Sequence, residues 1–126
     1  MGSRVLVVDD HPPMVRLVED ALVKEGYRVD SAGDGAECLE KLRADPPDLL
    51  ILDLAMPVMD GMEALRTLRH DAQAKKVPVI VLSARRDPRD MVDGWMSGAD
   101  LYLTKPCKMA DLMKAVKHLV PAPPRH

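Results

Sequence analysis

The sequence predicts an α/β fold in which five parallel strands alternate with helices. Two observations predict it. Short runs of β-branched and leucine residues alternate along the chain with longer stretches whose apolar residues recur at i, i+3 and i+4. The runs are nearly continuous in apolar residues, as expected for strands that helices cover on both faces. Right-handed crossovers between consecutive strands then give one doubly wound parallel sheet with helices on either side.

The length and composition agree with a single domain. A chain of 126 residues with 47% hydrophobic and 30% charged residues builds one core and is not disordered. The formal net charge of -2 provides no overall field that would attract nucleic acid or an anionic membrane. One Trp, two Tyr and no Phe leave too few rings for stacking nucleic-acid bases.

The five strands are predicted at five apolar runs, of which the second is weak. In chain order these runs are residues 5–8, 27–29, 49–52, 79–82 and 101–103.

Each of the four stretches between the runs, and the stretch after the last run, carries one apolar stripe of helical spacing. The stripes comprise Met14, Leu17, Val18, Ala21 and Leu22; Ala36, Leu39 and Leu42; Met62, Leu65 and Leu68; Val92, Trp95, Met96 and Ala99; and Leu112, Met113, Val116 and Leu119. Capping signals agree, because Pro12 suits a first helical turn, Gly26 suits a stop, and Asp34 with Glu37 has the spacing of a capping box.

The sequence shows no membrane span and no signal peptide, which predicts a cytoplasmic protein. Cys38 and Cys107 lie far apart without a Cys/His cluster, so we expect two buried free thiols rather than a zinc site or a disulfide. Residues 121–126 are rich in proline and cannot continue a helix. We therefore expect one domain over residues 1–120, followed by a proline-rich tail or the start of a linker.

Polar residues follow four of the predicted strands, at the point where each strand ends. Asp9 and Asp10 follow the first strand, Asp53 the third, Ser83 the fourth and Lys105 the fifth. Because the carboxyl ends of parallel strands converge on one crevice, these side chains are expected to form one cluster.

Three neighbouring carboxylates repel one another and call for a cation. Carboxylate oxygens are ligands that Mg²⁺ prefers, and Mg²⁺ with the ammonium of Lys105 would cancel the three negative charges. A neutral site accepts a phosphoryl group, which one aspartate attacks as a nucleophile while Ser83 donates to a phosphoryl oxygen.

With these residues in place, the sequence resembles the receiver domain of two-component response regulators, of the chemotaxis-response-regulator type. The resemblance covers about residues 4–120. Its motifs are Asp9-Asp10, Asp53-Leu54-Ala55-Met56-Pro57, Ser83-Ala84, Gly98-Ala99-Asp100 and Tyr102-Leu103-Thr104-Lys105-Pro106. It implies the flavodoxin-like (βα)5 receiver fold with the strand order 2-1-3-4-5.

The resemblance implies a role for each residue at the strand ends. Asp53 would accept a phosphoryl group from a histidine kinase or a phosphotransfer protein, and Lys105 would bind that group. Asp9, Asp10, Asp53 and the backbone carbonyl of Ala55 would hold Mg²⁺, for which Mn²⁺ is an expected substitute.

The resemblance also implies a switch. Ser83 would move towards the phosphoryl group and Tyr102 would turn inward, which changes the surface of the fourth helix, fifth strand and fifth helix. That surface would bind a downstream effector or output domain. We expect a monomer or a phosphorylation-dependent dimer without direct contact to nucleic acid or membrane. The protein would assist its own phosphorylation and dephosphorylation without being a metabolic enzyme.

The chain departs from the family pattern at several positions. Cys107 stands where an aromatic residue is common. Ala55 cannot orient a water molecule and Arg85 would cover the phosphoryl oxygens, so we expect a long-lived phosphoryl state.

Other functions remain open on the sequence alone. A receiver-like scaffold that does not use phosphate would have the same fold. A magnesium-dependent phosphatase with an aspartyl nucleophile would need a second Asp where this chain has Ala55. A flavodoxin-like nucleotide binder would need a hydroxyl- and glycine-rich loop after the first strand, where Asp9 and Asp10 stand.

Overall fold

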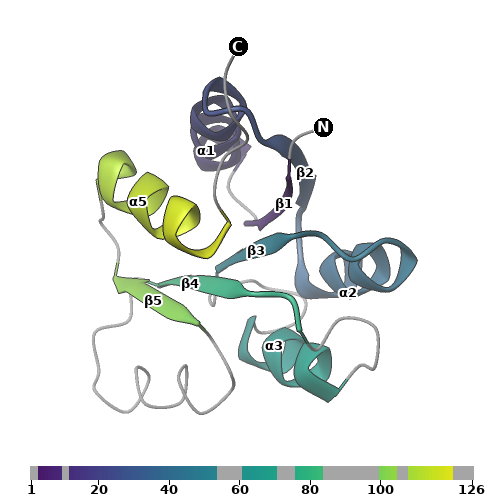
Figure 1. Cartoon of the computed structure of the whole chain (residues 1–126). Helices are drawn as coiled ribbons and strands as arrows, with labels where there is room; N and C mark the ends of the chain where they lie inside the picture. The colour runs from purple at the N-terminus through teal and green to yellow at the C-terminus, as the bar shows by residue number, and fades with distance from the viewer. Residues whose placement is uncertain are drawn as a thin grey trace.

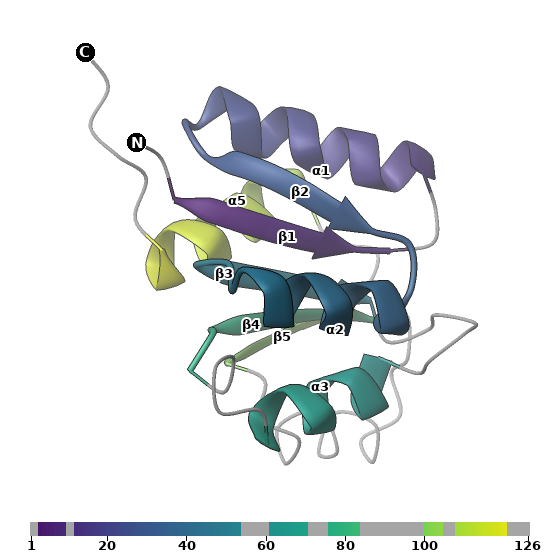
Figure 2. The ribbon, with the colours of Figure 1, turned by 90° about the vertical axis from the view of Figure 1, so that its right-hand side faces the viewer.

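The computed structural model describes residues 3–9, 12–53, 61–70, 76–83, 100–104 and 108–120, with only the backbone for residues 53, 61–65, 83 and 104. Five strands form one parallel sheet in the order β2-β1-β3-β4-β5. Helices α1 and α5 cover one face of the sheet, and helices α2 and α3 cover the other (Figures 1 and 2). The predicted fold class and strand order are confirmed.

The elements follow one another in the predicted alternation. The strands are β1 (Arg4–Val8), β2 (Arg28–Ala32), β3 (Leu49–Asp53), β4 (Val79–Ser83) and β5 (Leu101–Thr104). The described helices are α1 (Pro12–Lys24), α2 (Gly35–Ala44), α3 (Gly61–His70) and α5 (Met109–Leu119). The stripe predicted for a fourth helix, and the proline-rich residues 121–126, lie outside the described residues. No helix in the described part of the chain has the length and apolarity needed to cross a membrane.

The core consists of two apolar layers, one on each face of the sheet. In β3, Leu50 and Leu52 pack with residues of α2 and α3, whereas Leu49 and Ile51 pack with residues of α1 and α5. All four side chains are almost fully buried. Because successive side chains of a strand point to opposite faces, a strand covered on both sides must be apolar at every position.

Two of the predicted apolar stripes are partly wrong. In α1, Val18 and Leu22 are buried, but Leu17 is 57% exposed. Leu17 lies about 100° around the helix axis from Val18 and therefore falls on the solvent side. In α2, Ala36 is exposed and Cys38 is buried in the core.

Strand β2 lies at the edge of the sheet and pairs with β1 alone. It extends to residue 32, beyond the predicted run at 27–29, and includes the half-buried polar residues Asp30 and Ser31. An edge strand tolerates polar side chains because part of its surface faces water. The apolar run in the sequence is therefore shorter than the strand β2 itself.

The predicted helix signals are confirmed where they are described. Helix α1 begins at Pro12, and Gly26 has a φ of 97° in the turn after α1. That left-handed conformation favours glycine. Asp34 caps α2 by accepting a hydrogen bond from the backbone N–H of Glu37 at 2.8 Å. The Glu37 carboxylate accepts in turn from the N–H of Gly33 at 3.4 Å, which fixes the loop between β2 and α2.

Cys38 is a buried free thiol, as predicted. Burial, with a smaller contribution from the negative charge of Asp34, raises the pKa of the Cys38 thiol to about 12. The thiol is therefore protonated at neutral pH and unreactive. Cys107 lies outside the described residues.

Candidate functional site

The carboxyl edge of the sheet brings together residues from distant parts of the chain. Val8, the last residue of β1, pairs with Leu52 of β3. One residue further along each strand, Asp9 and Asp53 occupy neighbouring positions at the same level of the sheet. The two aspartates are 44 positions apart in the sequence, and parallel pairing brings their backbones side by side.

The neighbouring strands end close to the same level. Asp53 pairs with Leu82, so Ser83, the last residue of β4, lies one position beyond Asp53. Ser83 in turn pairs with Thr104, the last residue of β5. The strands β1, β3, β4 and β5 therefore end along one edge of the sheet. Asp9 directly follows β1, Asp53 and Ser83 end β3 and β4, and Thr104 at the end of β5 directly precedes Lys105.

Asp9 is buried at this edge, with 6% of its surface exposed. Its backbone N–H donates to the carbonyl of Ala32 at 3.2 Å, which ties the end of β1 to the end of β2. Among the side chains that the structure describes, Asp9 is the only charged one that is buried. Burying a carboxylate costs free energy unless a cation or hydrogen-bond donors compensate for the lost hydration. A buried acidic residue at this position is therefore typical of a functional site.

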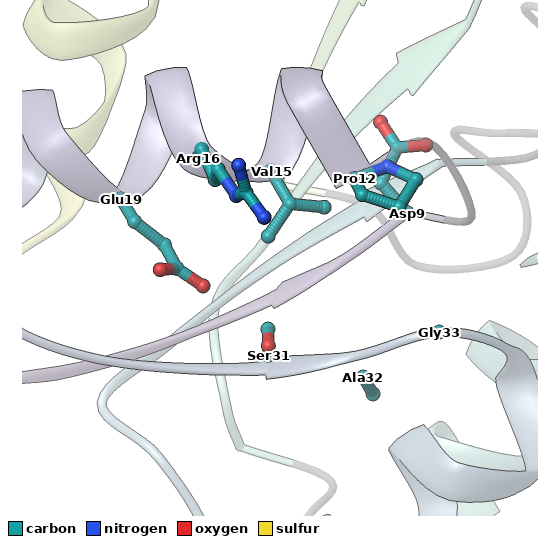
Figure 3. A pocket seen from close by; sticks show the side chains of 8 residues that line it. All are labelled: Asp9, Pro12, Val15, Arg16, Glu19, Ser31, Ala32 and Gly33. Atoms are coloured by element: carbon teal, nitrogen blue, oxygen red, sulfur yellow. The ribbon is translucent and has the colours of Figure 1, made fainter.

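A groove of about 370 Å³ lies beside Asp9, between α1 and the end of β2 (Figure 3). Its lining comprises Asp9, Pro12, Val15, Arg16, Glu19, Ser31, Ala32 and Gly33. The four lining residues of α1 recur at i, i+3, i+4 and i+7 and share one helix face. The sequence analysis assigned them no role, although that spacing was visible in the sequence.

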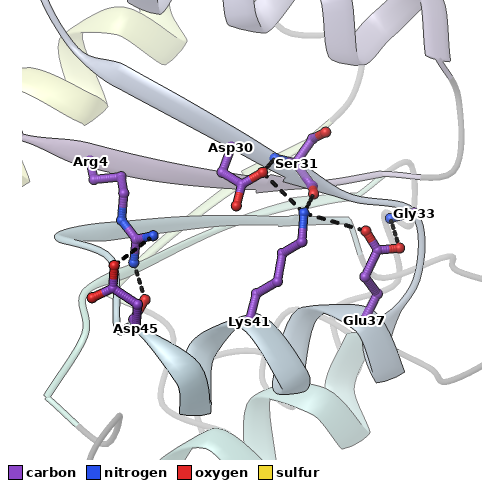
Figure 4. Close-up of polar contacts among 7 residues, drawn as sticks. All are labelled: Arg4, Asp30, Ser31, Gly33, Glu37, Lys41 and Asp45. Atoms are coloured by element: carbon purple, nitrogen blue, oxygen red, sulfur yellow. Dashed lines mark hydrogen bonds and ion pairs between the residues drawn. The ribbon is translucent and has the colours of Figure 1, made fainter.

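A set of polar contacts supports the β2 wall of this groove (Figure 4). The Lys41 ammonium donates to the Asp30 carboxylate at 3.0 Å and to the backbone carbonyl of Ser31 at 2.5 Å, and it lies 3.5 Å from Glu37. Burial alone would raise the pKa of Asp30, but hydrogen bonds from Lys41 and the Ser31 N–H, with nearby positive charges, lower that pKa. The hydrogen bond to Asp30 also raises the pKa of Lys41. These contacts hold α2 against β2.

Tyr102 lies in the middle of β5 and pairs with Val81 of β4. Its half-buried ring packs against the core layer beneath α2 and α3. Its hydroxyl oxygen is buried, and none of the described residues forms a hydrogen bond with it. Within the described part of the chain, apolar packing against this layer is therefore the contact that holds the ring.

The donor atoms at this edge suit a hard divalent cation. Of the predicted ligands only the side chain of Asp9 is described, and it offers carboxylate oxygens; the backbone pairing places Asp53 beside it at the same level. Oxygen donors of this kind are those that Mg²⁺ prefers. Asp10, Ala55 and Lys105 lie outside the described residues, and the side chain of Asp53 is not described. The described side chains contain no group of three or more His, Cys, Asp or Glu residues that would hold a metal by themselves.

Solved structures with the same fold resemble this chain closely. The chemotaxis response regulator CheY4 of Vibrio cholerae superposes with a TM-score of 0.87 at 33% identity, covering 94% of this chain and 98% of its own. The receiver domain of the sensor histidine kinase PA1611 of Pseudomonas aeruginosa superposes with a TM-score of 0.86 at 30% identity, with the same coverage. The PA1611 structure has a magnesium ion coordinated in its active site cleft.

Two sequence relatives are regulators rather than enzymes. The transcriptional regulatory protein PrrA of Mycobacterium tuberculosis is 44% identical over 119 residues, covering 94% of this chain and 50% of PrrA. The DNA-binding response regulator MtrA of Mycolicibacterium smegmatis is 40% identical over 117 residues, covering 93% of this chain and 50% of MtrA. The chain thus spans about half the length of these relatives. Their names give no support to the expectation that nucleic acid is absent from the partners.

The family model of the response regulator receiver domain matches residues 5–117. Aspartyl phosphate and Mg²⁺ are general properties of this family, which serves phosphorylation-dependent signalling in two-component systems. With 113 of 126 residues matched and relatives at 44% and 40% identity, this chain belongs to the response regulator receiver domain family.

Proposed function

We propose that phosphorylation of Asp53 controls this receiver domain. One observation carries the proposal: the buried carboxyl residue Asp9 and the strand-end residue Asp53 stand at the same level on adjacent strands, β1 and β3. A parallel sheet binds its ligands at this edge. The groove beside Asp9 leaves the edge accessible to solvent on the α1 side.

The phosphoryl transfer requires only one nucleophile from this chain. A carboxylate oxygen of Asp53 attacks the phosphorus of a phosphohistidine on a histidine kinase or phosphotransfer protein. The new O–P bond forms as the P–N bond breaks, and the imidazole leaves with the electron pair. The switch is turned off by hydrolysis: water attacks the phosphorus, which releases inorganic phosphate and restores the Asp53 carboxylate.

The remaining strand-end residues position and neutralise the phosphoryl group. Asp9, Asp10, Asp53 and the carbonyl of Ala55 would hold Mg²⁺ or Mn²⁺, which neutralises charge on the phosphoryl oxygens when bound. Lys105 donates to another phosphoryl oxygen. Its place follows from the sequence, because it comes directly after Thr104, the residue that pairs with Ser83.

Ser83 and Tyr102 form the switch in this proposal. Ser83 ends β4 and draws towards the phosphoryl group, and Tyr102 follows it inward. The hydroxyl of Tyr102 forms no hydrogen bond with the described residues, so a change in the position of the ring breaks none of the described hydrogen bonds. The surface formed by the helix predicted before residue 100, β5 and α5 then binds an effector.

The relatives suggest what the switch controls. PrrA and MtrA are transcriptional or DNA-binding regulators of about twice this length. We propose that residues 1–120 form the receiver domain, that residues 121–126 begin a linker, and that the regulated output is a DNA-binding domain of a cytoplasmic protein. In this arrangement the receiver itself does not touch DNA, and phosphorylation acts through the monomer or by promoting a dimer.

Intact-mass spectrometry tests the proposal. The purified chain is incubated with acetyl phosphate, with Mg²⁺ or with excess chelator, beside the variant Asp53→Asn. We expect one phosphoryl group on the wild type, only with Mg²⁺, and none on the variant. Equal labelling of the two proteins would reject Asp53 as the acceptor, and an unlabelled wild type would favour a phosphate-independent scaffold.

A further inference from the structure

Strand β5 lies at the edge of the sheet and pairs with β4 alone. It has four residues, Leu101–Thr104, and the side chains of the first three alternate between the two core layers: Tyr102 packs on one, and Leu101 and Leu103 on the other. A slip by one residue would exchange these faces and is excluded by burial. A slip by two residues would keep every face, so alternation alone does not fix the register of β5.

Asp100, the residue directly before β5, forms two hydrogen bonds with Val79 of β4, one as donor and one as acceptor. Its backbone N–H donates to the carbonyl of Val79 at 2.9 Å. Its carboxylate accepts the backbone N–H of the same residue at 2.7 Å. The carboxylate thus takes the place that a strand carbonyl would occupy in a longer ladder. Both hydrogen-bonding groups of Val79, the first residue of β4, are thereby joined to the residue that opens β5.

Arg69, in the last turn of α3, holds Asp100 from the other side. Its guanidinium donates to the Asp100 carboxylate at 3.0 Å and to the carbonyl of Val77 at 2.8 Å. Arg69 is 20% exposed and Asp100 is 41% exposed, so the ion pair alone contributes little. Its effect is geometric, because it aims the carboxylate at Val79 and joins α3, β4 and β5 at the amino edge of the sheet.

We infer that Asp100, oriented by Arg69, is a positioning residue that sets the register of β5 and so places the residues at the other end of the strand. This inference rests on the proposed function, in which Lys105 and Tyr102 act at the phosphoryl site and in the switch. A two-residue slip would move the end of β5 by about 6.6 Å along the sheet. Such a displacement would carry Lys105 out of reach of a phosphoryl group on Asp53.

The test combines a register measurement with a rate measurement on three variants. Asp100→Ala removes the acceptor for Val79, Asp100→Asn keeps an oxygen there, and Arg69→Met weakens the anchor while keeping its apolar stem. The control is Tyr27→Phe, which removes the hydrogen bond from the Tyr27 hydroxyl to the Val120 carbonyl and leaves the contacts between α3, β4 and β5 in place. Nuclear Overhauser contacts between Ile80 and Leu101 report the register without any phosphodonor.

We expect Asp100→Ala to lose the Ile80–Leu101 contact and to be phosphorylated by acetyl phosphate about tenfold more slowly than wild type, with Arg69→Met slowed less. Asp100→Asn should stay within about twofold of wild type, because an amide oxygen still accepts the N–H of Val79. Tyr27→Phe should match wild type in rate.

Several results would overturn the inference. An unchanged register in both Asp100→Ala and Arg69→Met rejects it, as does a lost register with an unchanged rate. Equal slowing of Tyr27→Phe would mean that lost stability, not register, lowers the rate. If wild type itself takes no phosphoryl group, the proposed function fails, and the register measurement alone then decides between a positioning and a passive Asp100.

Discussion

Similar charged residues have different roles at the amino edge of the sheet, where the strands begin, and at the carboxyl edge, where the strands end. At the amino edge, carboxylates lie near the surface and accept hydrogen bonds from backbone N–H groups or pair with arginine side chains of this chain. These contacts join neighbouring segments and leave the carboxylates engaged within the fold. At the carboxyl edge, the carboxyl residue Asp9 is buried beside a groove of about 370 Å³, within the size range of ligand sites. The comparison teaches that an acidic residue at a strand end indicates a site only where the fold buries it and leaves access to it.

Arg4 shows how the amino edge is closed (Figure 4). Its guanidinium forms an ion pair with the Asp45 carboxylate at 3.2 Å and donates to the Asp45 carbonyl. Its backbone N–H donates to the Asp48 carboxylate at 2.7 Å, and its carbonyl accepts the N–H of Asp48 at 2.8 Å. The start of β1 is thus joined to the segment that leads into β3.

The end of α5 is held at the same edge. The Tyr27 hydroxyl donates to the carbonyl of Val120 at 2.5 Å in a buried position. Lys117 forms an ion pair with Glu25 at 3.0 Å. Both contacts join the residues between α1 and β2 to the end of α5, so this edge stabilises the fold and lies opposite the proposed phosphoryl site.

The largest difference between the edges is expected in metal binding. Asp9→Asn should weaken Mg²⁺ binding about tenfold or more, because it removes a ligand charge at the carboxyl edge. Asp48→Asn is the matched control at the amino edge, where an amide oxygen still accepts the N–H of Arg4. Isothermal titration calorimetry measures both. Equal Mg²⁺ affinities for the two variants would remove the distinction between the edges.

The next difference concerns two buried tyrosine hydroxyls. Tyr27→Phe should lower the free energy of unfolding by about 1–2 kcal/mol, because it leaves the buried Val120 carbonyl without its donor. Tyr102→Phe removes a hydroxyl that no described residue binds, and should be neutral or stabilising. Urea denaturation measures both. Equal losses of unfolding free energy in the two variants would contradict the stabilising role of the hydrogen bond from Tyr27 to Val120.

Alkaline pH should weaken the amino edge through Tyr27. Burial, with a smaller effect of the negative charge of Glu25, raises the pKa of Tyr27 above its ordinary value of 10.0. The folded state therefore favours the protonated phenol. Its stabilisation is complete below a pH of about 10 and is lost as the pH rises through the folded-state pKa. Wild type should thus lose more stability than Tyr27→Phe above that pH, and parallel curves would contradict this.

The smallest effect is expected at the ion pair between Lys117 and Glu25. Both side chains are partly exposed, so Lys117→Ala should lower the free energy of unfolding by about 0.5 kcal/mol or less, and less still in high salt. Its rate of phosphorylation should equal that of wild type. A loss above about 2 kcal/mol would mean that this pair is a main support of α5.

The sequence predicted the ends of β1, β3 and β4 to within one residue, because their apolar runs stop visibly before Asp9, Asp53 and Ser83. It could not predict the contacts that close the amino edge. Arg69 and Asp100 are 31 positions apart and Tyr27 and Val120 are 93 positions apart, and no local pattern joins them. Their pairing follows from strand register and helix packing, which only the folded chain defines.

Exposure was the second property that the sequence left open. Leu17 fits the apolar spacing of α1 but faces solvent, because the stripe of Val18 and Leu22 already covers the sheet. Asp30 and Ser31 are polar yet belong to β2, because an edge strand is only partly covered.

The central claim is that the phosphoryl group is attached to Asp53 at the carboxyl edge. Reducing the acetyl-phosphate-treated protein with borohydride converts an aspartyl phosphate to homoserine, and peptide mass mapping then locates the converted residue. We predict homoserine at position 53 and at no other aspartate. Homoserine at an amino-edge aspartate such as Asp48, or its absence from a Mg²⁺-treated sample, would contradict the claim.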